Sequence, residues 1–322
     1  MNKIYDSPPN RRGTGSIKWD RPPQPGAEVT IPLWIADMDF PSPPPVIEAL
    51  KQRAEHGVFG YTMVQDSYYQ AVHHWFFSRF GLTVAPESVT VTPGIVPAIH
   101  SAIRAFSEEG DEIIIQNPVY YPFVSAVTEN RRNLLVNNLI ETGGRYSMDF
   151  EDLEQLASRE KAKILILCSP HNPVGRVWSR EELEQVADIA HRHSLLVISD
   201  EIHCDLIMPD SPRQHIPYSL IGEKASPTVL CNAPSKSFNI PGLATSNIII
   251  NDKTLRERFR RELKRSCTDH PNCFGPVAAE AAYLHGAPWL EETLDYIRGS
   301  RGLLGDFLSK HLPEISFSPL EA

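Results

Sequence analysis

Short apolar runs alternate with segments of helical spacing along most of the chain. The runs are rich in Ile, Leu and Val and are predicted as strands over 88–92, 111–116, 134–139, 162–168, 195–199, 228–232 and 246–250. Most are apolar at successive positions, which is typical of strands covered by helices on both faces. The segment 179–193 has helical spacing and begins with a Ser-x-x-Glu pattern. The alternation predicts a three-layer α/β sandwich with a mainly parallel sheet.

Prolines and further helical patterns bracket this sheet. Residues that precede proline are disfavoured in helices, so the proline-rich stretches 22–25 and 41–45 are expected to be extended and to wrap a surface. Helical patterns at 252–267, 276–285 and 288–312 follow the last strand. We therefore expect three parts. They are an N-terminal arm with part of a small domain (1–45), a large domain (46–250), and linking helices with a C-terminal small domain (251–322).

The last residues alternate in polarity. Ile315 and Phe317 are separated by serines, which predicts the first strand of a small sheet. A lone strand is not independently stable, so the small α/β domain is expected to be incomplete and the chain to be truncated.

Composition narrows the function classes. The chain has 322 residues, 41% hydrophobic and 22% charged, with a net charge of -9. The negative charge argues against a nucleic-acid surface, and the basic stretch 256–265 is expected to be a solvated helix face behind Leu255, Phe259 and Leu263. The five cysteines form no Cys-x-x-Cys pair, so we expect buried thiols and no metal site. Neither a signal peptide nor an apolar run of membrane-spanning length is found, which predicts a cytoplasmic protein without a membrane partner.

Two side chains suggest cofactor chemistry. Lys236 lies in a Pro-Ser-Lys-Ser turn just after the run 228–232, and Asp200 ends the run 195–199. Pyridoxal phosphate needs an amine that forms a Schiff base and a carboxylate that keeps the pyridine nitrogen protonated. The pair alone is weak evidence, because most lysines in such turns are simply solvated.

Three more polar segments follow predicted strands. Gly94 precedes a helical run at 97–106, where free amides can hold a phosphate, although an ordinary strand-to-helix turn gives the same pattern. Tyr120 can stack on a flat ring or belong to the core. Asn172 lies between prolines that hold its amide rigidly, so it can donate to a ring oxygen. Ligands of open α/β sheets bind at the carboxyl ends of the strands, where all these groups are expected.

At this point the sequence resembles the fold-type I pyridoxal-phosphate enzymes, in the class I/II aminotransferase-like group. The resemblance extends from about Arg12 to the last residue. It is strongest in Ser-Pro-His-Asn-Pro-Val-Gly (169–175), Ser-Asp-Glu-Ile-His-Cys-Asp-Leu (199–206) and Ala-Pro-Ser-Lys-Ser-Phe-Asn-Ile-Pro-Gly (233–242). The segments 12–20 and 33–40, together with His203, resemble the MalY/PatB branch of cystathionine β-lyases. Ordinary aminotransferases of the group usually carry Tyr at the position of His203.

The resemblance implies roles position by position. Lys236 would be the Schiff-base lysine, Asp200 the partner of the pyridine nitrogen, Asn172 a donor to the ring oxygen and Tyr120 the stacking ring. The phosphate would be held by four residues: Gly94, Ile95, Val96 and Ser235. In the family, further positions contact the substrate (Ile35, Ala36), the cofactor oxygen (His203) and the phosphate of the neighbouring subunit (Tyr61). The last of these implies a homodimer.

The implied activity is cleavage of the carbon–sulfur bond of cystathionine or related cysteine S-conjugates, releasing thiol, pyruvate and ammonia. Two alternatives stay open: an amino-acid aminotransferase, and a cofactor-binding regulatory or inactive protein. Some MalY-type proteins also act on a transcription regulator, so such a partner is permitted. Family members carry an arginine that pairs with the substrate carboxylate, and no arginine of this sequence has a matching context.

Overall fold

A seven-stranded sheet forms the centre of the computed structural model, which describes residues 3–21, 31–222 and 227–322. The strand order is β1-β9-β8-β7-β6-β2-β3. Its members are β1 (Val89–Thr92), β2 (Glu112–Asn117), β3 (Asn133–Asn138), β6 (Ala162–Cys168), β7 (Leu196–Asp200), β8 (Thr228–Asn232) and β9 (Ser246–Ile249). The β9 strand pairs antiparallel with β8 and β1, and the remaining pairs are parallel. All seven predicted strands are therefore present, and the sheet is mainly parallel as expected.

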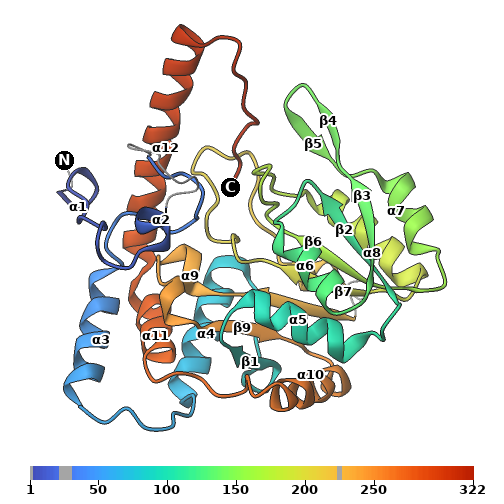
Figure 1. Ribbon diagram of the computed structural model, residues 1–322, viewed down its shortest axis with the longest axis horizontal. Coiled ribbons are helices and arrows are strands. Elements are labelled where there is room, and N and C mark those ends of the chain that lie inside the picture. The colour runs from blue at the N-terminus through green and yellow to red at the C-terminus, as the bar shows by residue number, and fades with distance from the viewer. Residues whose placement is uncertain (1–2, 22–30, 223–226) are drawn as a thin grey trace.

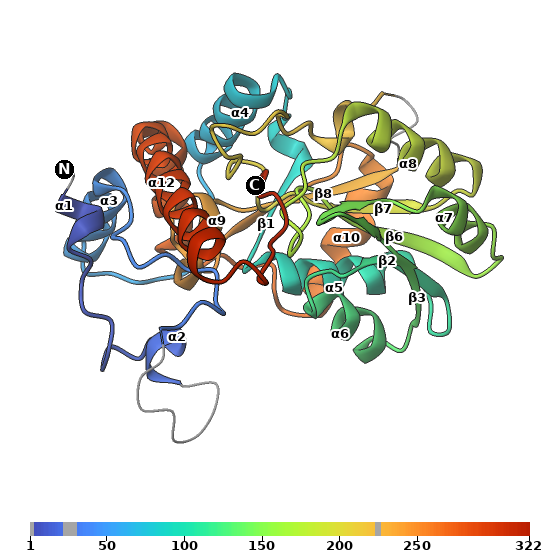
Figure 2. The same cartoon turned by 90° about the horizontal axis from the view of Figure 1, so that it is seen from above.

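Helices cover both faces of the sheet, as Figure 2 shows for α5 and α6 on one side and α7 and α8 on the other. The first face carries α5 (Ile95–Phe106), α6 (Pro122–Glu129) and α10 (Lys253–Arg265). The other carries α7 (Phe150–Ala157), α8 (Arg180–Arg192), α4 (Asp66–Phe80) and α11 (Gly275–His285). Along β6, Ile164 and Ile166 pack on the first face while Leu165 and Leu167 pack on the other. This alternation explains why the strand is apolar throughout.

Local signals in the sequence set several helix ends. The Ser179 hydroxyl accepts from the Glu182 amide and the Glu182 carboxylate accepts from the Ser179 amide, which completes the predicted capping box of α8. In α10, Phe259 and Leu263 are buried as predicted for the basic segment. Arg256 of the same helix is also buried and donates to the Ile250 carbonyl, so this arginine does not belong to the solvated face.

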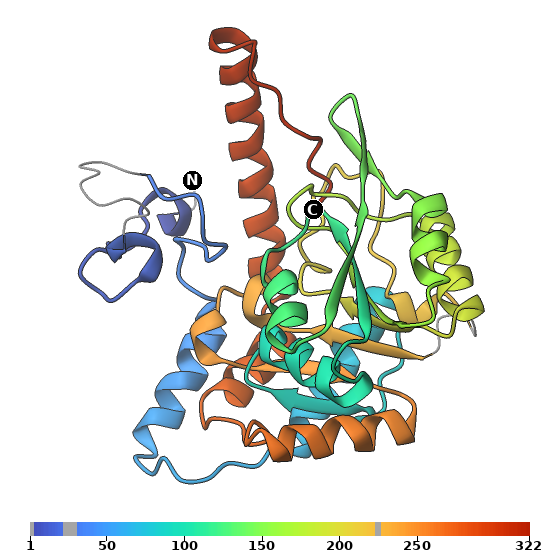
Figure 3. The ribbon, with the colours of Figure 1, turned by 45° about the vertical axis from the view of Figure 1, so that its right-hand side comes forward.

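The N-terminal part lies against α12 (Ala287–His311), a long helix that rises away from the sheet (Figures 1 and 3). Two short helices, α1 (Lys3–Asp6) and α2 (Ile17–Asp20), precede α3 (Pro44–Glu55). The Tyr5 ring stacks on Tyr296 of α12 at 4.8 Å between centroids. The remaining elements are the hairpin of β4 (Ile140–Thr142) and β5 (Arg145–Ser147), the four-residue helix α9 (Pro234–Ser237) and short 3-10 turns.

Three expectations from the sequence change, and one lies outside the described residues. The second proline stretch was expected to be extended, but Pro44 begins α3, because proline fits the first turn of a helix where no amide partner is needed. The first stretch, 22–25, lies outside the described residues. No strand forms at 315–317. Cys267 is exposed and Cys273 half-buried, whereas the other three cysteines are buried thiols.

None of the helices within 3–21, 31–222 and 227–322 is long and apolar enough to cross a membrane.

The packing of β6 can be tested at Ile166, a fully buried residue of the central sheet. We expect Ile166→Ala to lower the free energy of unfolding by about 2–5 kcal/mol, because it opens a cavity between strand and helix layer. Val136→Ala on the edge strand β3, where the side chain is 37% exposed, is the control and should cost less than about 1 kcal/mol. Urea unfolding measures both, and equal losses would contradict this account of the core.

Candidate active site

The predicted site residues follow strands that run in the same direction. Gly94 follows β1, Tyr120 follows β2, Asn172 follows β6 and Asp200 ends β7. The β2, β6 and β7 strands run parallel with β8, and β1 runs in the same direction because β1 and β8 are both antiparallel to β9. Their carboxyl ends therefore meet at one edge of the sheet. The β8 strand ends at the same edge and leads into α9, which carries Lys236.

Asp200 is a buried carboxylate at this edge, with 4% of the residue exposed. Its Oδ1 accepts one hydrogen bond, from the Ile202 amide at 3.1 Å. Among the described residues no cation lies within ion-pair distance of it. Burial raises the pKa of Asp200 to about 7, and the neighbouring charge of Glu201 acts in the same direction.

Lys236 lies within electrostatic reach of Asp200. Burial lowers the pKa of the Lys236 amine, while the charges of Asp37 and Asp200 oppose that shift. The Lys236 Nζ donates to the Ala36 carbonyl at 3.0 Å. The amine of α9 is thereby joined to the segment 33–40, which is about 200 residues away in the sequence.

A cavity of about 290 Å³ is lined by Ala36, whose carbonyl accepts from Lys236, and by His203, whose pKa the charge of Lys236 lowers. Lys236 and Asp200 themselves are not part of its lining. The cavity brings together three of the predicted residues, Ala36, Asn172 and His203. The rest of its lining is Pro170, His171, Pro173, Gly175, Leu206, Met208, Leu294, Ile297, Leu320 and Ala322. His171 and His203 are the ionisable side chains in this lining, and most of the other lining side chains are apolar.

The histidines of the cavity are neutral at physiological pH. Burial lowers the pKa of His203 to about 4, and the nearby charge of Lys236 lowers it further. Burial likewise lowers the pKa of His171 to about 4. The His171 Nε2 lies 2.8 Å from the Pro118 carbonyl, which fixes the ring beside Asn172.

The predicted phosphate residues lie at the start of α5 and on α9. Gly94 is the N-cap of α5, and the amides of Ile95 and Val96 in its first turn have no partner within the helix. Such amides and the helix dipole favour an anion. Ser235 precedes Lys236 on α9 and is half-buried.

Two predicted aromatic residues differ in their surroundings. Burial raises the pKa of Tyr120, and the charge of Asp200 adds to this, so the phenol and the carboxylate lie near each other. Tyr61 is fully exposed within the chain and does not line the cavity. Ile35 is half-buried and precedes Ala36, but it is not part of the lining.

Sequence reasoning missed the residues that hold the segment 33–40 in place. Asn239 donates to the carbonyls of Met38 and Phe40, and its Oδ1 accepts from the Met38 amide. Arg11 contacts Asp37 at 2.6 Å, and its other terminal nitrogen contacts Asp39 at 2.7 Å. Asn239 lies three residues after Lys236, and Arg11 directly precedes the segment 12–20. Their closeness to these motifs was the one signal in the sequence that could have pointed to them.

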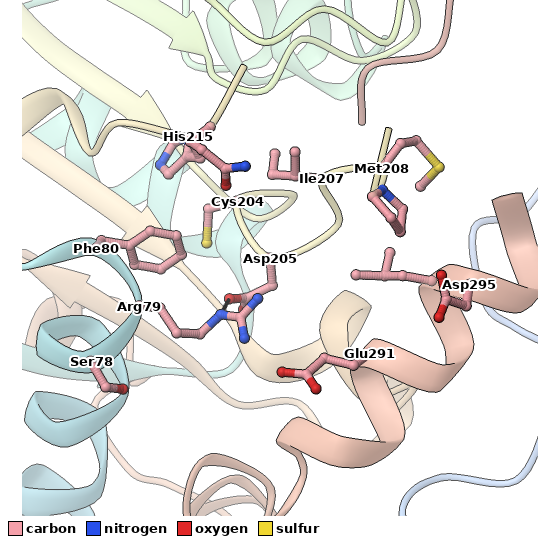
Figure 4. A pocket seen from close by; sticks show the side chains of 13 residues that line it. Ser78, Arg79, Phe80, Cys204, Asp205, Ile207, Met208, His215, Glu291 and Asp295 are labelled. Atoms are coloured by element: carbon pink, nitrogen blue, oxygen red, sulfur yellow. Dashed lines mark ion pairs between the residues drawn. The ribbon is translucent and has the colours of Figure 1, made fainter. Parts of the chain in front are cut away.

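A second cavity, of about 510 Å³, is lined by α4, the loop after β7 and α12, and is shown in Figure 4. Asp205 projects into it and pairs with the Arg79 Nε at 3.0 Å. The same carboxylate accepts from the Ser237 hydroxyl at 2.7 Å and from the Trp75 indole. Asp205 therefore supports the helix that carries Lys236 and was also missed from the sequence.

Comparison with known proteins gives the family. The model of the family "Aminotransferase class I and II" matches residues 29–321. The chain belongs to this family. It is 43% identical over 320 residues to cystathionine beta-lyase PatB of Bacillus subtilis, covering 99% of this chain and 82% of PatB. It is 35% identical to protein MalY of Escherichia coli, covering 98% and 80%.

Solved structures agree with this membership. The crystal structure of cystalysin from Treponema denticola, which contains a pyridoxal 5'-phosphate cofactor, superposes with a TM-score of 0.92. The sequences are 38% identical, and the match covers 98% of this chain and 80% of cystalysin. The predicted class I/II group, its MalY/PatB branch and the three-layer fold are thus confirmed.

The burial of Asp200 predicts a pH dependence of stability in the cofactor-free protein. The pKa is about 7 in the folded state and near 4 in an unfolded chain, so the folded state binds this proton more tightly. The favourable contribution is complete below pH 4 and is lost as the pH rises through 7. We expect Asp200→Asn to gain stability relative to the wild type between pH 5 and pH 8, by at most about 3 kcal/mol.

Urea unfolding at the two pH values measures this difference. Asp306→Asn, at an exposed position of α12, is the control and should leave the pH dependence unchanged. A constant difference between Asp200→Asn and the wild type would show that the carboxylate does not titrate in this range.

Proposed function

We propose that this protein is a pyridoxal-phosphate-dependent carbon–sulfur β-lyase. Its substrates are cystathionine or related cysteine S-conjugates, and its products are a thiol, pyruvate and ammonia. The observation that carries the proposal is that the Lys236 amine lies within electrostatic reach of the buried Asp200 carboxylate and donates to Ala36, which lines the cavity with Asn172 and His203. The similarity to cystathionine beta-lyase PatB over nearly the whole chain supports the reaction class.

The residues of the site fit the cofactor. Asp200 is a buried carboxylate without a cation partner among the described residues, and a protonated ring nitrogen would supply the missing positive charge. Asn172 borders the cavity and offers amide donors to the ring oxygen. The amides of Ile95 and Val96, with the hydroxyl of Ser235, are suited to the phosphate. Tyr120 lies near Asp200 and is suited to stack on the ring.

Lys236 carries the proton-transfer chemistry. Its amine anchors the cofactor between turnovers and takes the α-proton of the substrate during turnover. Burial favours the neutral amine, which is the form that accepts a proton. When bound, pyridoxal phosphate supplies a conjugated ring into which the electrons left on the α-carbon can spread. The thiolate then leaves from the β-carbon.

His203 and Ala36 contribute uncharged groups to the site. With a pKa of about 4, the His203 imidazole is neutral and can serve as a donor or an acceptor beside the ring. The Ala36 carbonyl holds the Lys236 Nζ when that amine is free. Ile35 and Ala36 are proposed to lie over the substrate.

The assembly and location belong to the same proposal. We propose a homodimer in which Tyr61 reaches the second copy, since this exposed tyrosine lies among the exposed apolar residues Val58, Phe59 and Met63. We also propose the division into 1–45, 46–250 and 251–322, and a cytoplasmic location in keeping with the unpaired thiols. The transcription-regulator partner stays a prediction.

Covalent capture tests the role of Lys236. We expect borohydride treatment of the wild-type holoprotein to add the mass of the cofactor to the peptide that contains Lys236. Lys236→Ala should abolish this mass because no amine remains at the site, whereas Lys253→Ala, at an exposed position of α10, should retain it. Mass spectrometry of the digested protein measures both. Labelling of another lysine would contradict the assignment.

Product analysis tests the reaction. We expect purified holoprotein to release pyruvate from cystathionine without any added 2-oxo acid, and Asp200→Ala to lower turnover at least about 100-fold, since the ring nitrogen loses its partner. Turnover that requires a 2-oxo acid would favour the aminotransferase, which the family match keeps as the second candidate. A bound cofactor without any product would favour a binding protein.

A further inference from the structure

The segment after α12 forms one wall of the candidate active site. From the end of this helix the chain turns back and descends toward the strand ends, as Figures 1 and 3 both show. Leu320 and Ala322 line the cavity that also contains Asn172 and His203. Glu321 lies between them and does not line the cavity. Two residues of this stretch therefore face the cavity, and the Glu321 carboxylate lies outside it.

The Glu321 carboxylate forms ion pairs with three guanidinium groups. The Glu321 Oε1 lies 2.7 Å from the Arg145 Nη2 and 2.7 Å from the Arg213 Nη1. The Oε2 lies 3.3 Å from the Arg176 Nε and accepts from the Val177 amide at 2.9 Å. The arginines come from β5 and from the loops that follow β6 and β7, so one carboxylate joins three elements. Glu321 is 3% exposed.

Backbone contacts fix the wall at the same point. The Glu321 amide donates to the Gly175 carbonyl at 2.8 Å, and the Met208 amide donates to the Glu321 carbonyl at 2.9 Å. Gly175 has φ of +66°, and a Cβ on it would lie 2.7 Å from the Leu320 Cδ1. Glycine is required there for both reasons, and the motif that carries Asn172 is thereby packed directly against the wall.

Charge makes this anchor strong. A buried carboxylate that lost its guanidinium partners would cost several kcal/mol, and three guanidinium groups left without Glu321 would repel one another. Arg176 keeps a second partner in Glu182, at 2.9 Å, whereas Arg145 and Arg213 meet at Glu321. Loss of the Glu321 charge should therefore release the wall and leave the capping box of α8 in place.

We propose that Glu321 is a positioning residue, which fixes Leu320 and Ala322 as the wall against which the sulfur substituent of the substrate packs. The inference rests on the proposed lyase function. Leu206, Met208, Leu294 and Ile297 continue the same wall and are apolar. If the wall holds this substituent, a bulky apolar group should contact it more extensively than the methyl group of S-methylcysteine does.

Steady-state kinetics with two substrates tests the proposal in the holoenzyme. We expect Glu321→Gln to lower kcat/KM for S-benzylcysteine about 10-fold, mainly through KM, because contacts with the wall are lost. The change for S-methylcysteine should stay within about 3-fold. Glu314→Gln, at an exposed position of the same segment, is the matched control and should change neither. Equal losses with both substrates would overturn the proposal, since a purely structural defect lowers the active fraction for every substrate.

A second pair of variants covers poor folding of Glu321→Gln. Arg145 is half-exposed, so its replacement should weaken the binding of the Glu321 carboxylate while Arg176 and Arg213 still hold it. Arg145→Gln should shift the same substrate ratio in the same direction, by a smaller factor, and Arg145→Lys should restore most of it by keeping the charge. Two outcomes would contradict a role for the Arg145 charge. One is an unchanged ratio of kcat/KM for the two substrates in Arg145→Gln, and the other is an equal shift of this ratio in both Arg145 variants.

Hydrogen exchange separates this proposal from the lyase function. The peptide that contains Met208 should exchange faster in Glu321→Gln than in the wild type, because the Met208 amide is bonded to the Glu321 carbonyl. If the wild type released no pyruvate from either substrate, the lyase function would fail. The hydrogen-exchange measurement would still test whether Glu321 fixes the segment, and unchanged exchange of the Met208 peptide would refute that role.

Discussion

The site depends on one buried carboxylate, which has no cation within ion-pair distance among the residues that the structure describes. Asp200 ends the β7 strand inside the sheet, where water cannot solvate it and where one backbone amide is its hydrogen-bond donor. Burial therefore holds its pKa near 7. Either a bound proton or a nearby positive charge relieves the cost of such a group, and a ligand with a protonated ring nitrogen would supply that charge.

Other buried carboxylates of the same region show the contrast. Asp205 pairs with Arg79, and Glu201 lies 2.9 Å from the His215 ring and accepts from Ser199 and Tyr218. These groups carry their partners within the chain, as buried structural charges usually do. Asp200 lies on the same short stretch of sequence and has no such partner in the part of the chain that the structure describes. The missing cation separates the functional carboxylate from its structural neighbours.

The sheet and the chemistry at its edge could be predicted from the sequence because both are written locally. A strand covered on both faces, such as β6, is apolar at successive positions, so most of the runs are visible without knowledge of their partners. Lys236, Asp200 and Asn172 follow such runs directly, and parallel pairing then brings them to one edge. The α4 helix was missed because its aromatic and histidine residues give only a weak helical pattern. Asn239 and Glu321 were missed because their partners lie far away in the sequence.

The two walls of the cavity illustrate why long-range contacts decide the site. Ala36 comes from the N-terminal segment, and Leu320 and Ala322 come from the C-terminal one, yet both segments lie at the cavity beside His203. Each segment is held by ion pairs that lie outside the cavity. Arg11 pairs with Asp37 and Asp39, and three arginines pair with Glu321. Ordering a terminal segment costs conformational entropy at every residue, and apolar contacts of one or two side chains cannot offset it. These ion pairs are directional and are partly shielded from water, so they fix both segments in one register, which the apolar lining alone could not specify.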